Sequence, residues 1–294
     1  MVFCKVLSIV VPHYNFKNEA LFTELEQQCL NLHLNFEIII IDDASIPTQK
    51  TYLQQFKKAN FKIILLEKNI GRAAIRNLLA AEASYPFLLF LDGDSYITNP
   101  NFIINYINFH HQNPDVDIIC GLRNYPEKIK KEKALHHYYG IKTEIFAAKE
   151  AFHSNNFFIK KEVFKDTKFD ESLSQYGYED VLFGLMAKTK GYTIKNLYNP
   201  VIHLQLKTNK EFITDTDAAL KNLAQLMKQP RYENLLKEIP LVCYYLKLKK
   251  TSLLGLFKNL KPYLRKSLEQ ENPNFLSLKK LQFYKLLQLD YFLS

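Results

Sequence analysis

The first 120 residues alternate short apolar segments with amphipathic ones, and this alternation constrains the fold more than any other feature. The apolar segments are nearly continuous, as strands buried on both faces are, and the segments between them repeat apolar residues at helical spacing. We therefore predict an α/β fold, with a mostly parallel sheet and helices on both of its faces. The predicted strands are 7–12, 36–43, 61–67, 87–91 and 117–122, and the predicted helices are 18–33, 48–59, 71–83 and 101–111.

The pattern changes after residue 122 and again after residue 209. We expect residues 1–209 to form one domain around the sheet, and residues 210–294 to form a helical appendage broken near four prolines. Between 123 and 209 the expected elements are a loop and a helix over the cleft at 123–150, a strand turning into a short helix at 154–164, a helix at 178–190, and one or two strands at 193–204.

The basic residues are concentrated in the appendage. The chain has a net charge of +9, and residues 210–294 hold 15 Lys and Arg against 8 Asp and Glu, whereas residues 1–209 hold 24 against 22. A nearly neutral first region suits an enzyme core. The basic region carries no recognised nucleic-acid-binding motif, so we expect no nucleic-acid partner.

The cysteines and the apolar segments bear on the compartment. The four cysteines are widely spaced and form no paired motif, which favours reduced thiols over disulfides or a zinc site. The apolar N-terminal segment is too short for a signal peptide and lacks a basic start, and no run approaches the ~20 apolar residues of a membrane span. We therefore expect a cytoplasmic protein. The cysteines are Cys4, Cys29, Cys120 and Cys243.

One predicted strand ends in two carboxylates. The sequence FLLFLDGDS places Asp92 and Asp94 directly after the buried strand 87–91. Acids at that point are costly unless they are neutralised, and hard cations such as Mg²⁺ or Mn²⁺ prefer carboxylate oxygens and also bind substrate phosphates. The motif therefore predicts a metal site that holds a phosphorylated substrate; the alternative is a solvated turn whose acids cap the next helix.

Polar residues also follow the other strands. His13-Tyr14-Asn15 follows the first strand, and Asp42-Asp43 with Ser45 ends the second. In parallel sheets, ligands bind beyond the carboxyl ends of the strands, so these residues are candidates for one cleft shared with the two acids after strand 87–91.

Five motifs occur in order along residues 6–205: SIVVPHYN, IIIIDDAS, NIGRAAIRN, LFLDGDS and FDESLSQYGYEDVLFGLMAKTKG. Together they resemble the family-two nucleotide-sugar glycosyltransferases of the GT-A fold. This resemblance implies that residues 1–209 are a GT-A catalytic domain with a Rossmann-like sheet.

The resemblance also implies roles for residues at the strand ends. Asp94 coordinates the metal that binds the nucleotide diphosphate, and Asp92 contacts the ribose or the metal. The acid after the second strand, Asp42 and with less support Asp43, recognises the nucleotide base. The remaining nucleotide-site residues that the resemblance implies are Pro12 and Tyr14, which pack the base, and Arg76, which lies near the nucleotide. Tyr14 is equally well explained as an ordinary aromatic at a strand boundary.

Further implied residues lie late in the chain. Asp180 is implied as the general base that takes the proton of the acceptor hydroxyl, and Glu179 as a residue that positions the acceptor, so that one displacement inverts the anomeric centre. Acids in a first helical turn also have a purely structural explanation, since they offset the helix dipole. His203 is either a further metal ligand or a histidine of the core.

The implied function is transfer of a sugar from a nucleotide-sugar donor, UDP-linked by resemblance, to a glycan or lipid-linked acceptor in cell-surface polysaccharide or lipopolysaccharide synthesis. A nucleotidylyltransferase would need a glycine-rich loop after the first strand, and VPHYNFKN has no glycine. An inactive nucleotide-sugar-binding protein, or a scaffold of a glycan-assembly complex, is the alternative.

The appendage interleaves leucines and aromatic residues with lysines between 241 and 268. Two interpretations stay open. The apolar face packs on the core or on a second subunit, or the helix lies on an anionic membrane and makes the protein peripheral at its inner face. The residues expected on that face are Leu253, Leu256, Phe257, Leu260 and Leu264.

Overall fold

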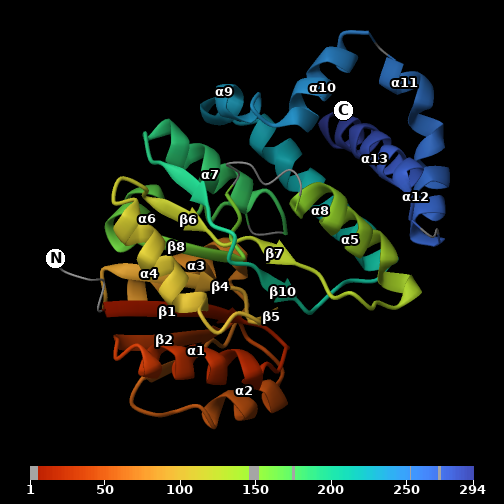
Figure 1. Ribbon diagram of the computed structural model, residues 1–294. Helices are drawn as coiled ribbons and strands as arrows, with labels where there is room; N and C mark the ends of the chain where they lie inside the picture. The colour runs from red at the N-terminus through yellow and green to blue at the C-terminus, as the bar shows by residue number, and fades with distance from the viewer. Residues whose placement is uncertain (1–5, 146–151, 174–175, 252, 271–272) are drawn as a thin grey trace. The chain divides into compact units, whose positions relative to one another are not determined.

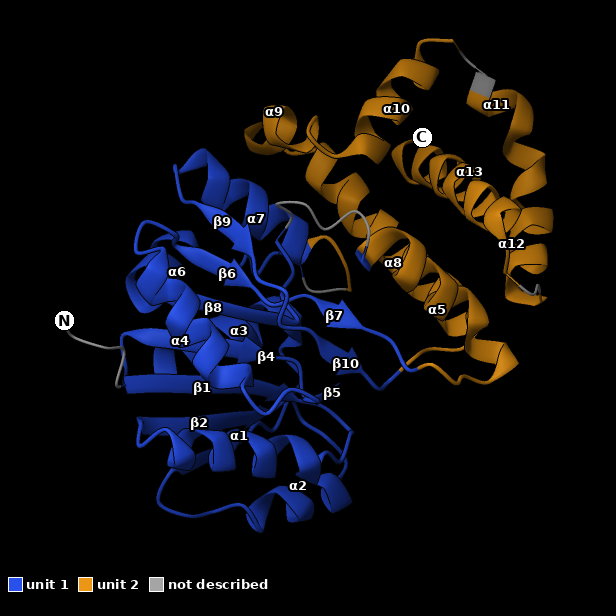
Figure 2. Ribbon diagram, viewed as in Figure 1, with its two compact units in different colours: residues 1–126, 145–174, 179–205 blue, residues 127–144, 175–178, 206–294 orange. Residues whose placement is uncertain are grey.

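The computed structural model describes residues 6–145, 152–173, 176–251, 253–270 and 273–294 (Figure 1). The chain forms two compact units (Figure 2). Unit 1 comprises residues 1–126, 145–174 and 179–205, and unit 2 comprises residues 127–144, 175–178 and 206–294. The expected boundary after residue 209 therefore falls within unit 2, which also takes in two short segments from earlier in the chain.

Unit 1 is built on a seven-stranded sheet in the order β3-β2-β1-β4-β8-β6-β9. Its neighbouring strands pair in parallel, except that β8 runs antiparallel to both β4 and β6. The mostly parallel sheet expected from the sequence is confirmed. The strands are β1 (Val6–His13), β2 (Asn35–Asp42), β3 (Phe61–Leu65), β4 (Phe87–Leu91), β6 (Ile118–Cys120), β8 (Asn156–Lys160) and β9 (Ile194–Asn196).

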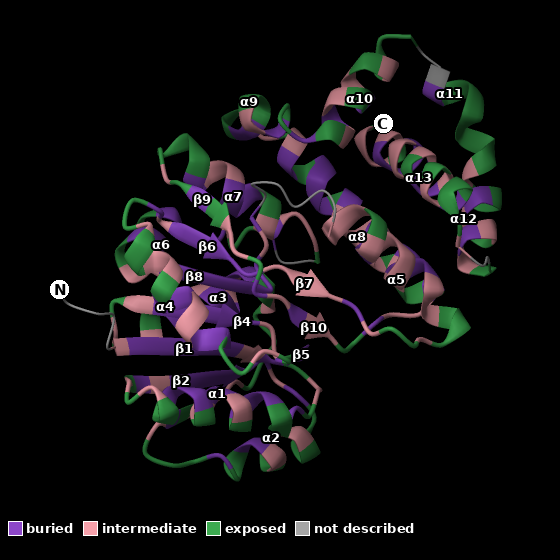
Figure 3. Ribbon diagram, in the orientation of Figure 1, coloured by how far each residue is buried: buried purple, intermediate pink, exposed green. Residues whose placement is uncertain are grey.

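Both faces of this sheet are buried, which explains why its central strands are apolar without alternation. In β4, Leu89 and Leu91 join one apolar cluster, whereas Leu88 and Phe90 join the other. Helices α1 and α4 contribute to the first cluster, and α3, α6 and α7 to the second. Figure 3 shows β1, β2, β4, β6 and β8 mostly in the buried colour. The helices of unit 1 are α1 (Glu19–Asn31), α2 (Pro47–Gln54), α3 (Gly71–Glu82), α4 (Phe102–Gln112), α6 (Lys161–Thr167) and α7 (Glu179–Thr189).

A second, three-stranded sheet consists of β5 (Ser95–Tyr96), β10 (Val201–His203) and β7 (Arg123–Asn124). Strand β10 pairs antiparallel with β5 and in parallel with β7. Two of the three strands have only two residues, too few for any periodicity, so the sequence did not predict them. This sheet matters for the site because its register sets His203 opposite Ser95, one residue after the acidic turn.

Some predicted boundaries were wrong by a few residues. Helix α2 ends at Gln54 rather than at residue 59, because the chain turns there and buries Phe56 against Phe22 and Phe61. The segment 123–150 begins with β7, which was not expected, and continues in unit 2 as short helices. These are η1 (Lys131–Lys133), α5 (Ala134–Tyr139) and the π-helix η2 (Gly140–Ile145). That this segment covers the cleft stays a prediction.

Unit 2 is helical, as expected. Helix α8 begins with a capping box in which Glu211 and Thr208 bond reciprocally. Prolines stand where helices begin: Pro230 starts η3, Pro240 starts α10, and Pro262 is the second residue of α12. The remaining helices are α8 (Asn209–Met227), η3 (Pro230–Tyr232), α9 (Glu233–Leu236), α10 (Pro240–Lys249), α11 (Leu253–Phe257), η4 (Lys258–Leu260), α12 (Lys261–Gln270) and α13 (Phe275–Leu293).

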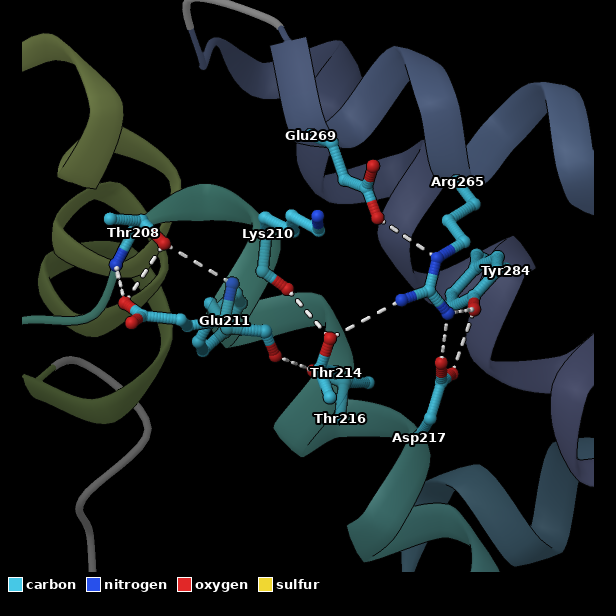
Figure 4. Close-up of polar contacts among 10 residues, drawn as sticks. Thr208, Lys210, Glu211, Thr214, Thr216, Asp217, Arg265, Glu269 and Tyr284 are labelled. Carbon is cyan, nitrogen blue, oxygen red and sulfur yellow. Dashed lines mark hydrogen bonds and ion pairs between the residues drawn. The ribbon is translucent and has the colours of Figure 1, made fainter.

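A polar network ties three of these helices together (Figure 4). Arg265 of α12 forms an ion pair with Asp217 of α8, and the hydroxyl of Tyr284 of α13 donates to the same carboxylate at 2.7 Å. Arg265 also bonds Glu269 on its own helix at 2.9 Å and the hydroxyl of Thr214 at 3.3 Å. A carboxylate shared by an arginine and a tyrosine fixes the relative rotation of the three helices.

The leucines expected on one helical face fall into two groups. Leu264 is buried within unit 2, whereas Leu256, Phe257 and Leu260 are exposed, and the side chain of Leu253 lies outside the described residues. Packing within unit 2 therefore accounts for Leu264, and the membrane contact of the exposed residues stays a prediction.

Two other expectations concern cysteines and membrane spans. Cys29, Cys120 and Cys243 are free, and Cys4 lies outside the described residues. Within the described part of the chain, every helix is too short or too polar to cross a membrane.

Candidate active site

The acidic turn Asp92-Gly93-Asp94 lies between β4 and β5, where the apolar strand ends. A Cβ on Gly93 would lie 2.8 Å from the backbone oxygen of Pro12, so only glycine fits beside the end of β1. The side-chain amide of Asn18 donates to the carbonyl oxygens of Gly93 at 2.9 Å and of Ser95 at 2.7 Å. Asn18 is also the N-cap of α1. The turn is therefore held from two sides by backbone and by a buried amide.

Asp92 pairs with Arg76 of α3. The Arg76 Nη2 to Asp92 Oδ1 distance is 2.7 Å, and the arginine is buried, with its guanidinium 5.6 Å from the ring centre of Phe169. The structure thus brings together two residues that the sequence nominated separately. A guanidinium fixed in this way keeps a defined orientation at the end of β4.

Asp94 pairs with His203 of β10, at 3.2 Å between Oδ2 and Nδ1. Burial by itself would raise the pKa of Asp94, but the hydrogen bond from His203 and nearby positive charges hold it below its usual value. The carboxylate is therefore ionised at neutral pH. The positive charges are those of His203, Arg72 and Arg123.

The pairing of Asp94 with His203 bears on the metal prediction. Across the described residues, no group of three or more His, Cys, Asp and Glu side chains is placed to hold a metal ion. Mg²⁺ and Mn²⁺ sites, however, commonly use one or two protein ligands and take the rest from substrate phosphates and water. An adjacent carboxylate and imidazole fit such a site, with Asp94 and His203 as ligands. Asp92, expected as a further ligand, has one oxygen engaged by Arg76.

Asp42, expected to recognise the base, is fully buried. Its Oδ1 lies 2.8 Å from Nδ1 of His13, and its Oδ2 accepts from the backbone N–H of Ser45 at 2.9 Å. Burial opposes ionisation, yet the bonds with His13 and Ser45 hold the pKa of Asp42 below its usual value. Nε2 of His13 is buried and unpartnered within the described residues. The carboxylate therefore fixes a histidine at the end of β1, and base recognition by Asp42 stays a prediction.

Asp43 has a clear structural task. Its two oxygens accept from the backbone N–H groups of Ile70 at 2.7 Å and Gly71 at 3.2 Å, at the start of α3. Burial and the neighbouring charge of Asp42 nevertheless raise the pKa of Asp43. Gly71 has φ = 83°, a conformation that favours glycine. Asp43 thereby anchors the helix that presents Arg76.

Pro12 and Tyr14 lie at the end of β1 and just after it. Tyr14 is largely exposed, and the next residue, Asn15, has φ = 49° and donates its backbone N–H to the hydroxyl of Ser45. The loop after β1 is thus tied to the loop after β2. An exposed ring there is free to pack on a ligand, and that role stays a prediction.

Glu179 and Asp180 open α7, as expected. Glu179 is buried, and burial together with the charge of Asp180 raises its pKa, although the positive charges of Arg72 and Arg76 oppose the shift. Asp180 is less buried, and its Oδ1 accepts from the backbone N–H of Val181 at 2.7 Å. The two acids therefore differ in environment: one is held close to arginines, and the other is accessible.

Sequence reasoning missed several residues that shape this site. Asn18 was expected only as the first residue of a helix, and Arg72 was given no role, although the charge of Arg72 acts on both Asp94 and Glu179. His13 was noted but given no role. An asparagine at a helix N-cap is a visible signal, but which carbonyls its amide reaches depends on the fold.

Residues 8–172 match the sequence model of the family described as "Glycosyl transferase family 2". The chain belongs to this family. The matched region contains the acidic turn and Arg76, whereas α7 with its two acids and His203 lie beyond it.

Curated relatives match over a part of their length. An uncharacterised glycosyltransferase of Haemophilus influenzae is 36% identical over 116 residues, which are 39% of this chain and 37% of that protein. A poly(ribitol-phosphate) beta-glucosyltransferase of Bacillus spizizenii is 30% identical over 138 residues, 43% of this chain and 21% of that protein. The chain thus aligns with well under two thirds of either relative.

Two solved structures confirm the GT-A fold. Residues 1–349 of S. aureus TarS align with 97% of this chain and 88% of that chain, with a TM-score of 0.51 and 18% identity. The mannosyltransferase PcManGT of Pyrobaculum calidifontis, solved with GDP-Man and Mn²⁺, aligns with 98% of this chain and 86% of that chain, with a TM-score of 0.60 and 13% identity. At these identities the likeness concerns the fold.

Proposed function

We propose that this chain is a metal-dependent, inverting glycosyltransferase that moves a hexose-type sugar from a nucleotide diphosphate to an acceptor hydroxyl. The observation that carries the proposal is the pair of neighbouring contacts at the end of β4, Asp92 with Arg76 and Asp94 with His203. An ionised carboxylate beside an imidazole suits a divalent cation, and a fixed guanidinium beside it suits phosphate or ribose oxygens.

Each residue then has a task. Asp94 and His203 hold Mn²⁺ or Mg²⁺, which when bound offsets the charge that develops on the departing diphosphate. Arg76, oriented by Asp92, donates to the nucleotide. The loops after β1 and β2 receive the base, with Tyr14 against its face and the pair of His13 and Asp42 at its edge. Asp43 contributes indirectly, through the start of α3.

The two acids of α7 have different roles in the reaction. Asp180, the more accessible one, takes the proton from the acceptor hydroxyl as that oxygen attacks the anomeric carbon and the diphosphate leaves from the opposite face. Glu179, held near arginines and with a raised pKa, orients the acceptor and the guanidinium groups. A single displacement of this kind inverts the anomeric centre.

The relatives guide the choice of substrates. Structures of TarS are described with UDP and with UDP-GlcNAc, and the B. spizizenii relative is named for transfer to poly(ribitol phosphate). We therefore propose a UDP-sugar donor and a cell-surface glycan or lipid-linked acceptor, used at the cytoplasmic side of the membrane. Unit 1 would be the catalytic domain, and unit 2 would provide a contact with an anionic membrane.

Nucleotide binding and turnover test this proposal. Isothermal titration with UDP and GDP, with and without Mn²⁺, should give metal-dependent binding to one of them, and labelled UDP-sugars should be transferred or slowly hydrolysed. Asp94→Asn should reduce turnover by about 10²–10³-fold, the size of effect seen when an enzyme loses one group that stabilises charge in the transition state. Asp115→Asn is the matched control, because Asp115 is exposed and lies just before β6. The amino end of this strand is at the end of the sheet away from the site.

The same experiments address the alternative of an inactive binding or scaffold protein. Metal-dependent nucleotide binding without transfer or donor hydrolysis would favour that alternative. Full activity of Asp94→Asn or of Asp180→Asn would contradict the assigned mechanism.

A further inference from the structure

Unit 2 exposes large apolar side chains within one short segment. Leu256, Leu260 and Tyr263 are 76%, 44% and 71% exposed. They belong to α11, η4 and α12, three short helical elements that are consecutive in the chain. Figure 3 shows α11 largely in the exposed colour. We call these three residues, with Phe257 between them, the apolar patch.

The patch is distinct from the surface by which the segment packs in its own unit. Leu254, Leu264 and Leu268 are buried and supply the contacts with the rest of unit 2, where α12 packs on α8 and α13. The patch residues lie outside the buried core, and Phe257 packs edge-on against Phe283. Exposed apolar residues gathered in this way usually mark a binding surface.

The charge around the patch indicates the partner. Residues 240–294 contain ten Lys and Arg against three Asp and Glu. Exposed lysines lie in and beside the patch, and they continue along the preceding helix. They are Lys247, Lys249, Lys250, Lys258 and Lys266.

This combination fits the surface of an anionic bilayer. Leucine and tyrosine side chains are buried at the boundary of headgroups and acyl chains, while lysines reach the phosphates around them. A second copy of this chain fits poorly, since the lysines of two facing patches would repel each other. A nucleic acid would leave the leucines without an apolar partner.

We propose that the segment from Leu256 to Tyr263 is an interfacial membrane anchor, lying in the plane of an anionic bilayer with the lysines of α10 and η4 on lipid phosphates. This deepens the membrane contact proposed above with specific residues, and it does not depend on sugar transfer. The segment is far too short to cross a membrane, so binding is peripheral and reversible.

Vesicle co-sedimentation tests the anchor. The full chain is mixed, without donor or acceptor, with phosphatidylcholine vesicles that contain or lack phosphatidylglycerol. We expect binding to the anionic vesicles only, weakened by salt. The double variant Leu256→Ser with Leu260→Ser should bind roughly tenfold to a hundredfold more weakly, as expected when two leucines lose their apolar contact. Substituting Gln at Lys247, Lys249 and Lys250 together should reduce binding by a comparable factor.

A matched control separates the patch from general surface hydrophobicity. Tyr198 and Leu30, in unit 1, are 76% and 49% exposed, close to the values for Leu256 and Leu260. The double variant Tyr198→Ser with Leu30→Ser should bind vesicles like the wild type. Because all four residues are exposed, circular dichroism and thermal unfolding should show that both variants remain folded.

Three results would overturn the proposal. They are equal binding to neutral and anionic vesicles, unchanged binding by the patch variant, and a wild-type dimer that the patch variant dissociates while vesicle binding is unaffected. The last would make the patch a self-association surface. Each outcome is independent of transferase activity, so an active enzyme that ignores vesicles would refute the anchor and leave the proposed function intact.

Discussion

Asn18 offers the sharpest test of how the acidic turn is held. Its side-chain oxygen caps α1 by accepting from the backbone N–H of Leu21 at 3.3 Å, while its amide nitrogen donates to the carbonyls of Gly93 and Ser95. Asn18→Asp keeps the capping oxygen, since aspartate caps helices as well as asparagine does. It removes both donors and sets a carboxylate against two carbonyl oxygens.

The cost follows from those contacts. Each carbonyl left without its donor in a buried position costs about 1–3 kcal/mol, and the repulsion of the introduced charge adds to this. We expect unit 1 to lose at least about 2–6 kcal/mol of stability in total. For a unit of this size that corresponds to a fall of roughly 10 °C in the unfolding midpoint. Because the turn would also shift, metal-dependent nucleotide binding should weaken.

The assay is thermal unfolding followed by circular dichroism, together with titration of a nucleoside diphosphate and Mn²⁺. Asn274→Asp is the matched control: Asn274 caps α13 through an oxygen that accepts from the backbone N–H of Ser277 at 3.0 Å. That cap survives the substitution, so its stability should change by no more than about 0.5 kcal/mol. Lowering the pH should partly rescue Asn18→Asp, because a protonated carboxyl regains one donor.

Equal and small losses in the two variants would show that the amide of Asn18 does not hold the turn. A large loss in Asn18→Asp with unchanged nucleotide affinity would separate the turn from the binding site. Either result would refute the reasoning that links this asparagine to the site.

Three further predictions test other parts of the structure. Gly93→Ala should cost about 1–3 kcal/mol and reduce turnover, measured by unfolding and transfer assays, because its Cβ would meet the backbone oxygen of Pro12 at 2.8 Å. Glu179→Gln should abolish transfer. Its free energy of unfolding should nevertheless increasingly exceed that of the wild type as the pH rises. The folded-state pKa of Glu179 is raised, so the wild type loses stability as pH rises from the unfolded-state pKa through the folded-state pKa, and a pH series of unfolding midpoints would show the two proteins converging at low pH. Tyr284→Phe should destabilise unit 2 by about 1–2 kcal/mol through loss of the 2.7 Å bond to Asp217, without changing nucleotide affinity.

The sequence predicted the central sheet because its strands are buried on both faces. Short apolar runs such as 36–41 and 87–91 are typical of strands in the middle of a covered sheet, and the structure confirms strands there. The small second sheet was not predicted: β10 lies in the segment 193–204 that was expected to contain strands, but β5 and β7 have two residues each, too few for any periodicity. The antiparallel direction of β8 was also missed, since direction depends on pairing with strands far away in the chain.

The sequence predicted the acids of the site, but not the side chains that they contact. Acids at strand ends are visible in the sequence, and the structure sets them at one edge of the sheet. Their partners were not visible: His203 reaches Asp94 only because β10 pairs with β5, about a hundred residues earlier in the chain. Arg76 was nominated for the nucleotide, and its bond to Asp92 depends on how α3 packs against the sheet.

The acids at the strand ends differ in the groups to which their carboxylate oxygens are bonded. Both oxygens of Asp43 accept hydrogen bonds from backbone N–H groups, and the oxygens of Asp42 bond His13 and Ser45. Both carboxylates therefore hold the conformation of loops. Asp92 and Asp94 meet an arginine and a histidine, side chains that can share a carboxylate with an incoming ligand. We therefore propose that the acids after β2 mainly shape the site and that the acids after β4 bind the ligand. If this division holds, Asp43→Asn should lower stability more than nucleotide affinity, and Asp94→Asn should do the reverse.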